Sequence, residues 1–189
     1  MNANESIKNL FDSDNIIQAF TVQHHTVAEC LESGQIHRQP WIKSAAFTTT
    51  PSDPTGQLHR RAYLWMASQF AKRKSRRLHS APIWIGFSAD RALACIKDCE
   101  TVVLQVAIPA SEVLLSQYYR SPTEKWERVL WGEPCCTHEF LQTCIHGSSL
   151  RSKRLSWETL FLLTGDPTDW QAIVDRLEPH WLICRKVAK

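Results

Sequence analysis

The segment TVVLQVAI, residues 101–108, constrains the fold more than any other stretch of the chain. It is almost wholly apolar and rich in β-branched residues, a composition typical of a strand that is buried on both faces of a sheet. Pro109 follows directly, and proline cannot donate to the ladder of hydrogen bonds between strands. The sequence therefore predicts a central, buried strand that ends at this proline.

Three other segments have the composition of strands. Residues 16–22 mix β-branched and aromatic side chains, residues 82–87 form the short apolar run PIWIGF, and residues 181–187 carry a related pattern. Short apolar runs of this kind are typical of strands. We expect these segments to contribute, with residues 101–108, to one small mixed or antiparallel sheet.

The strongest helix signal covers residues 57–74. Its apolar side chains recur at i, i+4 spacing and make one face of a helix. The face consists of Leu58, Ala62, Met66 and Phe70, with Tyr63 and Ala67 beside them. The preceding segment TTTPSDPTG, residues 48–56, contains two prolines and a glycine, which favour a loop.

Shorter helices are expected on both sides of this one. Residues 25–33 predict a helix with Gly34 as its C′ residue, and Ser88 can cap a helix over residues 89–97. Two more helices are predicted, one that begins with the capping box SPTE at residues 121–124 and one over residues 138–146. Residues 156–163 are compatible with either helix or strand.

These elements fit one domain of the α+β class. The chain has 189 residues, enough for one well-buried core, and it contains no internal repeat, low-complexity tract or strong linker. We expect a single α+β domain over residues 16–189, with helices packed around a small sheet. Residues 1–15 are polar and are expected to be flexible or to form a short helix.

Composition and targeting signals indicate a cytoplasmic protein. Hydrophobic residues make up 43% and charged residues 22% of the chain, as is usual for globular domains. The start, MNANESIKNLFDSDNIIQAF, lacks the cationic and apolar regions of a signal peptide, and no apolar run approaches the roughly 20 residues of a membrane span. The seven cysteines are an odd number, which without an exported context is typical of reduced thiols.

Five cations lie close together in FAKRKSRRLH, residues 70–79. The formal net charge is +3, from 22 basic and 19 acidic residues, and without these five it would be 17 against 19, or −2. Two interpretations are open: a solvated helix end whose cations complement the helix dipole, or a nucleic-acid-binding cluster, although binders more often have a broad basic face. This basic cluster consists of Lys72, Arg73, Lys74, Arg76 and Arg77.

No standard catalytic signature is present. The chain lacks the phosphate-binding GxxxxGK[ST], the dinucleotide-binding GxGxxG, the GxSxG elbow and the HExxH zinc motif, so the common enzyme classes that use them are not expected. One group of thiols and imidazoles has enough ligands for zinc, but its spacing is not that of a finger or ribbon. We expect free thiols beside surface histidines and no zinc at this group, which is Cys135, Cys136, His138, Cys144 and His146.

Glu158 and three aromatic residues are further candidates for a site. Glu158 lies in the apolar segment LSWETLFLL; burial would raise the pKa of its carboxyl group and suit a general base, whereas an exposed position would give it no such role. Tyr63, Trp65 and Trp84 can stack on a base or a nicotinamide ring, and core packing is the alternative for each.

Several stretches occur in a distinctive order: FTVQHHTVAECLESGQIH, RRAYLWMASQF, APIWIGF, ETVVLQVAIPASEVLLSQ, WERVLW, SWETLFLL and WQAIVDRLEPHWLICRKV. This order covers nearly the whole chain and resembles an uncharacterised bacterial domain-of-unknown-function family, in which a WTIQ-like strand, an AYDWM-like helix, a PIW strand and a SWERIFDL–QA ending recur. The chain departs from that pattern at IGFSADRA, which replaces an aromatic run, and at the basic cluster. The resemblance implies a shared fold and no particular activity.

The order of elements also resembles compact ADP-ribosyltransferase domains. A strand, a helix ending in Ser-Gly, a helix carrying Ala-Tyr, an apolar strand ending in Ile-Pro and a late glutamate follow one another, which is an analogy of fold. This resemblance implies NAD as the cofactor, a polar residue on the first strand and an aromatic ring that stacks on nicotinamide. It also implies a glutamate that either stabilises the oxocarbenium-like ribose or orients the acceptor. The matching positions are Gln23, Tyr63 and Glu158, and Gln23 replaces the histidine or arginine usual in that family.

The sequence thus leads to hypotheses from different classes. The first is an ADP-ribosyltransferase-like enzyme that uses NAD to modify a protein or nucleic acid. The alternative is a non-enzymatic binding module that holds nucleic acid or an acidic protein through the basic cluster, with help from Arg60, Arg61, Arg151, Lys153 and Arg154. A third is an interaction protein whose tryptophan-rich surface, drawn from eight tryptophans, binds a partner.

Overall fold

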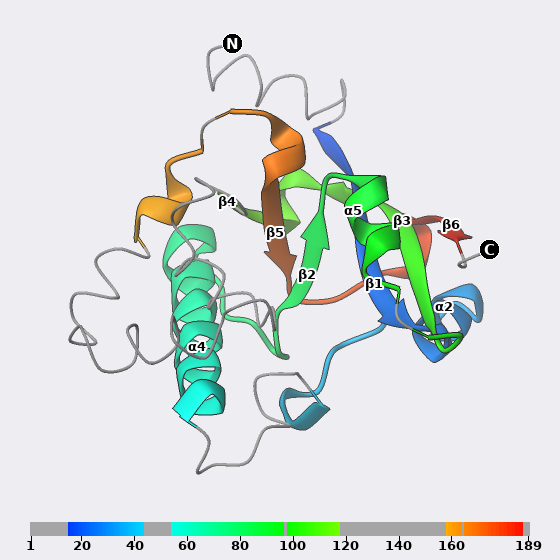
Figure 1. Cartoon of the computed structure of the whole chain (residues 1–189), viewed down its shortest axis with the longest axis horizontal. Coiled ribbons are helices and arrows are strands. Elements are labelled where there is room, and N and C mark those ends of the chain that lie inside the picture. Colours follow the sequence, from blue (N-terminus) through cyan, green and yellow to red (C-terminus); the bar gives the residue numbers. More distant parts are fainter. Residues whose placement is uncertain (1–14, 44–53, 97, 118–157, 164, 187–189) are drawn as a thin grey trace.

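The computed structural model describes residues 15–43, 54–96, 98–117, 158–163 and 165–186. Within them, six strands form one sheet in the order β4-β5-β2-β1-β3-β6, and every neighbouring pair is antiparallel (Figure 1). The strands are β1 (Ile16–His24), β2 (Ile83–Gly86), β3 (Thr101–Pro109), β4 (Leu114–Gln117), β5 (Trp170–Val174) and β6 (Leu182–Lys186). The α+β class and an antiparallel sheet are therefore confirmed.

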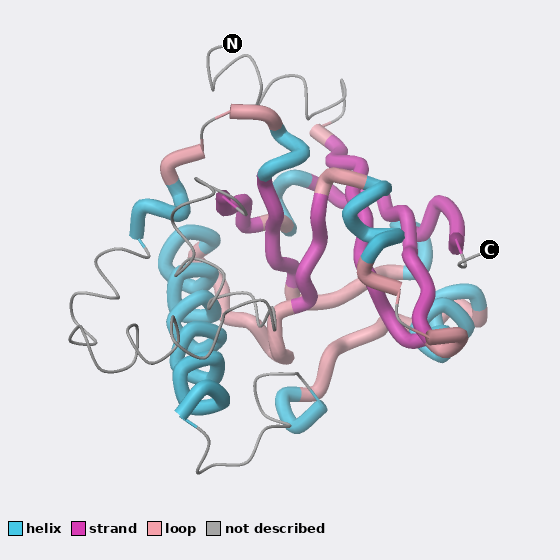
Figure 2. Tube along the Cα trace, viewed as in Figure 1, coloured by secondary structure: helices cyan, strands magenta, loops and turns pink. Residues whose placement is uncertain are grey.

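Helices and short 3₁₀ turns surround this sheet (Figure 2). The α-helices are α2 (His25–Glu32), α4 (Pro54–Lys74) and α5 (Ala89–Ala94). The 3₁₀ turns are η1 (Trp41–Lys43), η2 (Ala110–Glu112), η4 (Thr159–Phe161), η5 (Pro167–Asp169) and η6 (Pro179–Trp181). Among the described residues, no helix has both the length and the apolar composition needed to cross a membrane.

The apolar segment TVVLQVAI forms β3, which lies inside the sheet between β1 and β6. Every residue of β1 pairs with β3, from Ile16 opposite Pro109 to His24 opposite Thr101. The buried apolar residues of β3 are Val102, Val103, Leu104, Val106 and Ile108. The prediction of an interior strand is confirmed, and Pro109 is its last residue.

Several predicted boundaries move by a few residues. Helix α4 begins at Pro54, so residues 54–56 belong to the helix and not to the predicted loop; proline is well tolerated in the first turn, where an N–H has no partner in the helix. Helix α5 begins after its Ser88 cap as predicted but ends at Ala94. The final strand begins at Leu182, because η6 occupies the residues before it.

The remaining predicted elements either agree with the structure or fall on residues that the structure does not describe. Helix α2 is present, and Gly34 follows it with φ of +82°, a conformation that glycine adopts without strain. Of residues 156–163, those from 159 to 161 form the turn η4. Residues 1–14, 48–53 and the expected helices after residue 120 lie outside the described residues.

The main hydrophobic core lies on one face of the sheet, called here the α2 face. Helix α2 contributes Val27, Ala28 and Leu31, which pack with Ile17 of β1 and Val106 of β3. All of them are almost fully buried. This cluster anchors the β1–β3 pair, which carries the longest register in the sheet.

Helix α4 lies on the opposite face, called here the α4 face. Phe20 of β1 stands opposite Gly86 of β2, and successive residues of a strand point to opposite faces. Phe20, Gly86 and Trp84 therefore share the face that Ile17 does not. The ring of Trp84 contacts Tyr63 of α4 at a centroid distance of 5.6 Å, and this contact places α4.

His37 makes the stability of the fold dependent on pH. Its backbone exchanges two hydrogen bonds with Leu177, at 3.0 and 2.9 Å. Burial lowers the pKa of His37, and a hydrogen bond with Gln39 opposes this only in part. The unfolded chain therefore binds this proton more readily than the folded chain, so the stabilisation is present above the unfolded pKa of about 6.5 and is lost as the pH falls through the folded pKa.

Replacing His37 with glutamine is expected to reduce the loss of Tm between about pH 7 and pH 5. Glutamine does not titrate, so the unfolded chain no longer binds an extra proton at this position. Thermal denaturation at a series of pH values measures this slope. The matched control is His180→Gln, since the His180 side chain is 72% exposed. An unchanged slope in the His37 variant would contradict the prediction.

Candidate functional site

Gln23 lies near the end of β1, on the α2 face of the sheet. Its Nε2 donates to Oγ1 of Thr21 at 2.8 Å, and that hydroxyl in turn donates to the carbonyl oxygen of Trp84 at 2.7 Å. Thr21 is buried and Gln23 is half-buried. The side chain of Gln23 therefore supports a hydrogen-bonded connection between β1 and β2.

Tyr63 packs helix α4 onto the sheet. It is only 6% exposed, and its ring meets that of Trp84 edge to face. Burial raises the pKa of the Tyr63 hydroxyl, and a hydrogen bond with Trp84 offsets part of this. A neutral, buried phenol that contacts another aromatic ring has the properties of a core residue.

Glu158 lies beside the second half of α4. Its carboxylate accepts hydrogen bonds from Nε2 of Gln69 at 3.0 Å and from Arg73 at 3.2 Å. Its side chain is 40% exposed, so the apolar segment around it does not bury the carboxylate.

Gln23, Tyr63 and Glu158 are not brought into one cleft. Gln69 and Arg73, the partners of Glu158, come 6 and 10 residues after Tyr63 on α4, which corresponds to about 9 and 15 Å along a helix axis. Gln23 points to the other face of the sheet from Trp84, the ring that Tyr63 contacts. The arrangement implied by the ADP-ribosyltransferase resemblance is therefore not assembled by these three side chains.

Three members of the basic cluster bind other parts of the chain. Arg73 pairs with Glu158 and lies over the ring of Phe161, 3.8 Å from its centroid. Lys74 donates to the carbonyl oxygen of Ala110 at 3.0 Å, and burial, followed by the charge of Arg76, lowers the pKa of its ammonium group. These contacts attach the end of α4 to η4 and η2.

Arg76 is the third of these cations, and it is held by a bidentate contact. Its guanidinium donates two hydrogen bonds to Glu112, at 3.0 and 2.6 Å, a bidentate geometry that is among the stronger polar contacts in proteins. Lys72 and Arg77, in contrast, are exposed. The basic cluster thus includes structural cations as well as cations that face solvent.

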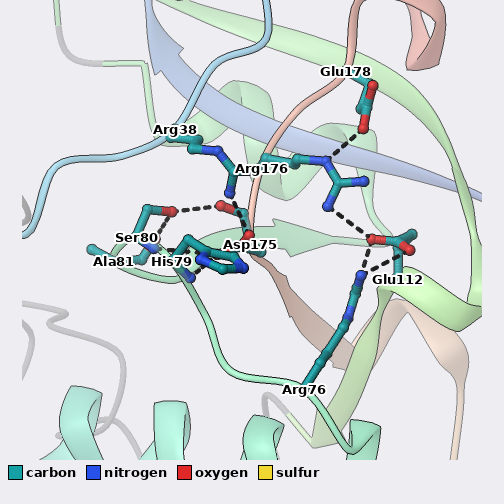
Figure 3. Close-up of polar contacts among 9 residues, drawn as sticks. All are labelled: Arg38, Arg76, His79, Ser80, Ala81, Glu112, Asp175, Arg176 and Glu178. Atoms are coloured by element: carbon teal, nitrogen blue, oxygen red, sulfur yellow. Dashed lines mark hydrogen bonds and ion pairs between the residues drawn. The ribbon is translucent and has the colours of Figure 1, made fainter.

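Glu112 connects this helix end to the segment after β5 (Figure 3). It also forms an ion pair with Arg176 at 3.4 Å, and Nε of Arg176 donates to Glu178 at 2.5 Å. Burial by itself would lower the pKa of Arg176, but the hydrogen bond and the nearby charges of Glu178, Glu112 and Asp175 raise it. Arg176 is therefore cationic whenever the protein is folded.

Asp175 forms the second half of this network (Figure 3). It is 3% exposed, forms a short ion pair with Arg38, and accepts from the backbone N–H groups of His79 and Ser80 at 2.5 and 3.2 Å. The hydroxyl of Ser80 donates to the backbone carbonyl of Asp175 at 2.5 Å. One carboxylate thus joins three segments that are far apart in the sequence, and every contact in this half of the network has an evident structural role.

A pocket of about 310 Å³ lies on the α4 face of the sheet, next to α5. Its floor is formed by Phe20 and Val22 of β1, Trp84 and Gly86 of β2, and Gln171 of β5. A Cβ atom added at Gly86 would meet no other atom within 4 Å. The absence of a side chain at this position therefore leaves open space above the middle of the sheet, and we call this space the Gly86 pocket.

Two short segments form the walls of the Gly86 pocket. One wall consists of α5, which contributes Ala92, and of Cys95 directly after it; the other wall contains Thr168 and Trp170. Arg91 of α5 joins them, because its guanidinium donates to the carbonyl oxygen of Thr168 at 2.7 Å and to Asp169 at 2.5 Å. The pocket is lined mainly by aromatic and aliphatic groups with a few polar ones, which is typical of small-molecule sites.

The sequence indicated only part of this pocket. Trp84 was a candidate for stacking, and it does line the pocket. Gly86 and Gln171 carried no signal of their own, although glycine inside a strand often marks a place where a ligand approaches the backbone. The predicted zinc-free group at residues 135–146 lies outside the described residues, and within the described part no group of three or more metal-binding side chains occurs.

Comparison with known proteins adds no relative to this picture. No family model, curated protein or solved structure matches the chain.

Proposed function

We propose that this chain is a ligand-binding domain whose site is the Gly86 pocket. The observation that carries the proposal is the open space above Gly86, because a Cβ there would meet nothing within 4 Å. Gly86 is the last residue of β2, and a glycine in a strand costs stability relative to a residue with a side chain. A vacant position on the floor of an otherwise well-filled sheet is consistent with a place kept for a ligand.

The lining indicates the kind of molecule that would fit. A volume of about 310 Å³ is at the small end of the range for ligand pockets, about 300–1,000 Å³. Phe20 and Trp84, whose side chains are on the α4 face of the sheet, supply aromatic surface, which favours flat rings. A compact, flat and largely apolar compound is therefore the expected ligand class.

The test compares a pocket-filling variant with a matched control. Gly86→Leu places an aliphatic side chain in the open space, whereas Gln18→Leu adds the same side chain at an exposed position of β1 that lies on the same face of the sheet. Ligand-observed NMR with quinoline, indole and 2-quinolinone as probes measures binding. At least one probe is expected to bind the unmodified chain and the Gln18 variant alike, and to bind Gly86→Leu about tenfold or more weakly.

Two outcomes would contradict this proposal. In one, none of the three probes binds the unmodified protein. In the other, a probe binds Gly86→Leu as well as it binds the control. Circular dichroism of both variants shows whether each is folded, and Gly86→Leu is expected to be no less stable, since glycine loses more conformational freedom on folding.

ADP-ribosyl transfer from NAD stays a prediction from the resemblance. It would need a carboxylate, an aromatic ring and a polar group around one cleft, and the residues matched to these roles are dispersed on α4, on both faces of the sheet and near η4. The binding module that uses the basic cluster also stays a prediction. Its support is the exposure of Lys72 and Arg77, while Arg76 and Lys74 are held within the protein.

A further inference from the structure

Gln171 gives the Gly86 pocket a specific polar feature, and the inference drawn from it rests on the proposed function. The residue stands opposite Gly86 in the β2–β5 pair, so its side chain is on the pocket face of the sheet. It is 5% exposed and lines the pocket. An amide that is buried to this extent normally satisfies its hydrogen-bonding groups.

The hydrogen bonding of Gln171 is incomplete. Its Nε2 donates to the carbonyl oxygen of Gln117 at 3.5 Å, which is a long contact. Within the part of the chain that the structure describes, its Oε1 accepts no hydrogen bond. On the other side of Gln171 from Gly86, Ser116 also has a buried hydroxyl, which finds no hydrogen-bond partner among the described residues. The end of the pocket floor therefore offers an unused acceptor in a largely apolar setting.

The charges around the pocket are already compensated. Arg91 is the cation in the lining, and its guanidinium is bound to Asp169 and to the carbonyl oxygen of Thr168. A charged ligand would have to break these contacts or remain without a counter-ion in an apolar site, which is costly. The electrostatics thus favour a neutral ligand.

Taken together, these features point to one chemical class. We infer that the Gly86 pocket binds a neutral, flat heteroaromatic cyclic amide, whose ring N–H donates to Oε1 of Gln171. The adjacent carbonyl of such a compound can accept from Nε2 of the same side chain, because a carboxamide presents a donor and an acceptor side by side. Aromatic side chains contact the rings of the ligand, and Gln171 recognises the N–H and carbonyl groups at the edge of its ring.

The first experiment compares three close analogues on the unmodified protein. The probes are 2-quinolinone, 1-methyl-2-quinolinone, which lacks the N–H, and 3-methyl-2-quinolinone, which keeps the N–H and has the same added bulk. The two compounds with an N–H are expected to bind about tenfold more tightly than the N-methyl compound, in proportion to one hydrogen bond in a buried site. Titration calorimetry or ligand-observed NMR gives the dissociation constants.

The second experiment assigns the preference to Gln171. In Gln171→Leu the tenfold preference should fall to about one, while all three probes still bind through ring contacts. The control is Ser116→Ala, which alters the neighbouring buried hydroxyl outside the pocket lining and should keep the preference. If Gln171→Leu does not fold, the side-chain NH₂ signals of Gln171 in the unmodified protein should shift with 2-quinolinone and much less with the N-methyl compound.

The outcomes separate this inference from the proposed function. Equal binding of all three compounds to the unmodified protein, with loss of all three in Gly86→Leu, overturns the inference and leaves the pocket as a binding site. A preference that persists in Gln171→Leu also overturns it. Failure of every probe to bind overturns both proposals.

Discussion

Replacing Asp175 with alanine is expected to lower the free energy of unfolding by about 3 kcal/mol, because the change removes the acceptor of a buried polar network. Asp175 is 3% exposed and accepts from two backbone N–H groups, those of His79 and Ser80. Without it both donors lose their partner, and Arg38 loses its counter-ion. The Arg38 side chain is 41% exposed and water can reach it, so most of the loss comes from the amides.

Thermal or urea denaturation measures this effect. For a chain of this length the expected fall in Tm is roughly 6–12 °C. Asp169→Ala is the matched control, since Asp169 also pairs with an arginine but is 37% exposed, and surface pairs contribute about 1 kcal/mol or less. If the two variants lost equal amounts of unfolding free energy, the burial of Asp175 would make no additional contribution to stability, contrary to the prediction. The loss of stability in Asp175→Asn, which retains an oxygen acceptor, should lie between the losses in these two variants.

Replacing Arg76 with glutamine is expected to cost about 1.5 kcal/mol, because Glu112 loses its bidentate partner at a partly buried position. The exposed fractions of the Arg76 and Glu112 side chains are 34% and 18%, so solvent screens this pair only in part. Arg76 also lies over the ring of Phe70, 5.4 Å from its centroid, and that contact would be lost as well.

Arg77→Gln provides a control within the same basic cluster. Arg77 is exposed, and changes at such positions usually alter stability by less than about 0.5 kcal/mol. Denaturation of the two variants under identical conditions gives the comparison. If they were equally stable, the cluster would be a solvated surface throughout, and the attachment of α4 to Glu112 would have no measurable strength.

The two Arg variants also bear on the interpretation of FAKRKSRRLH. From the sequence, five cations within six consecutive positions are equivalent, and each is available to a partner. In the folded chain Arg76 is bonded to Glu112 and Lys74 to Ala110, residues more than thirty positions away along the chain. Sequence proximity could not distinguish the structural cations from the exposed ones, since the distinction depends on which distant groups fold against them.

In the candidate site too, local sequence could not show which distant residues a side chain would contact. Tyr63 was singled out for its ring and Glu158 for its apolar surroundings, and both also for their place in the order of elements along the chain; none of these signals reports which distant residues they contact. The fold buries Tyr63 against Trp84 and leaves the carboxylate of Glu158 beside Arg73. Gln171 had no local peculiarity, and Gly86 had only the general one of a glycine in a predicted strand. The two residues became neighbours only through the pairing of β2 with β5.

The sequence by itself determined the elements whose signals are local. The apolar run of β3, the spacing of the apolar residues on α4, the cap at Ser88 and the glycine after α2 are each set by the preferences of a few consecutive residues. The order of the strands, the joining of three segments by Asp175 and the open space above Gly86 were decided by the tertiary structure alone. Each of these depends on contacts between residues far apart in the chain, and short-range preferences carry no information about which distant segments meet.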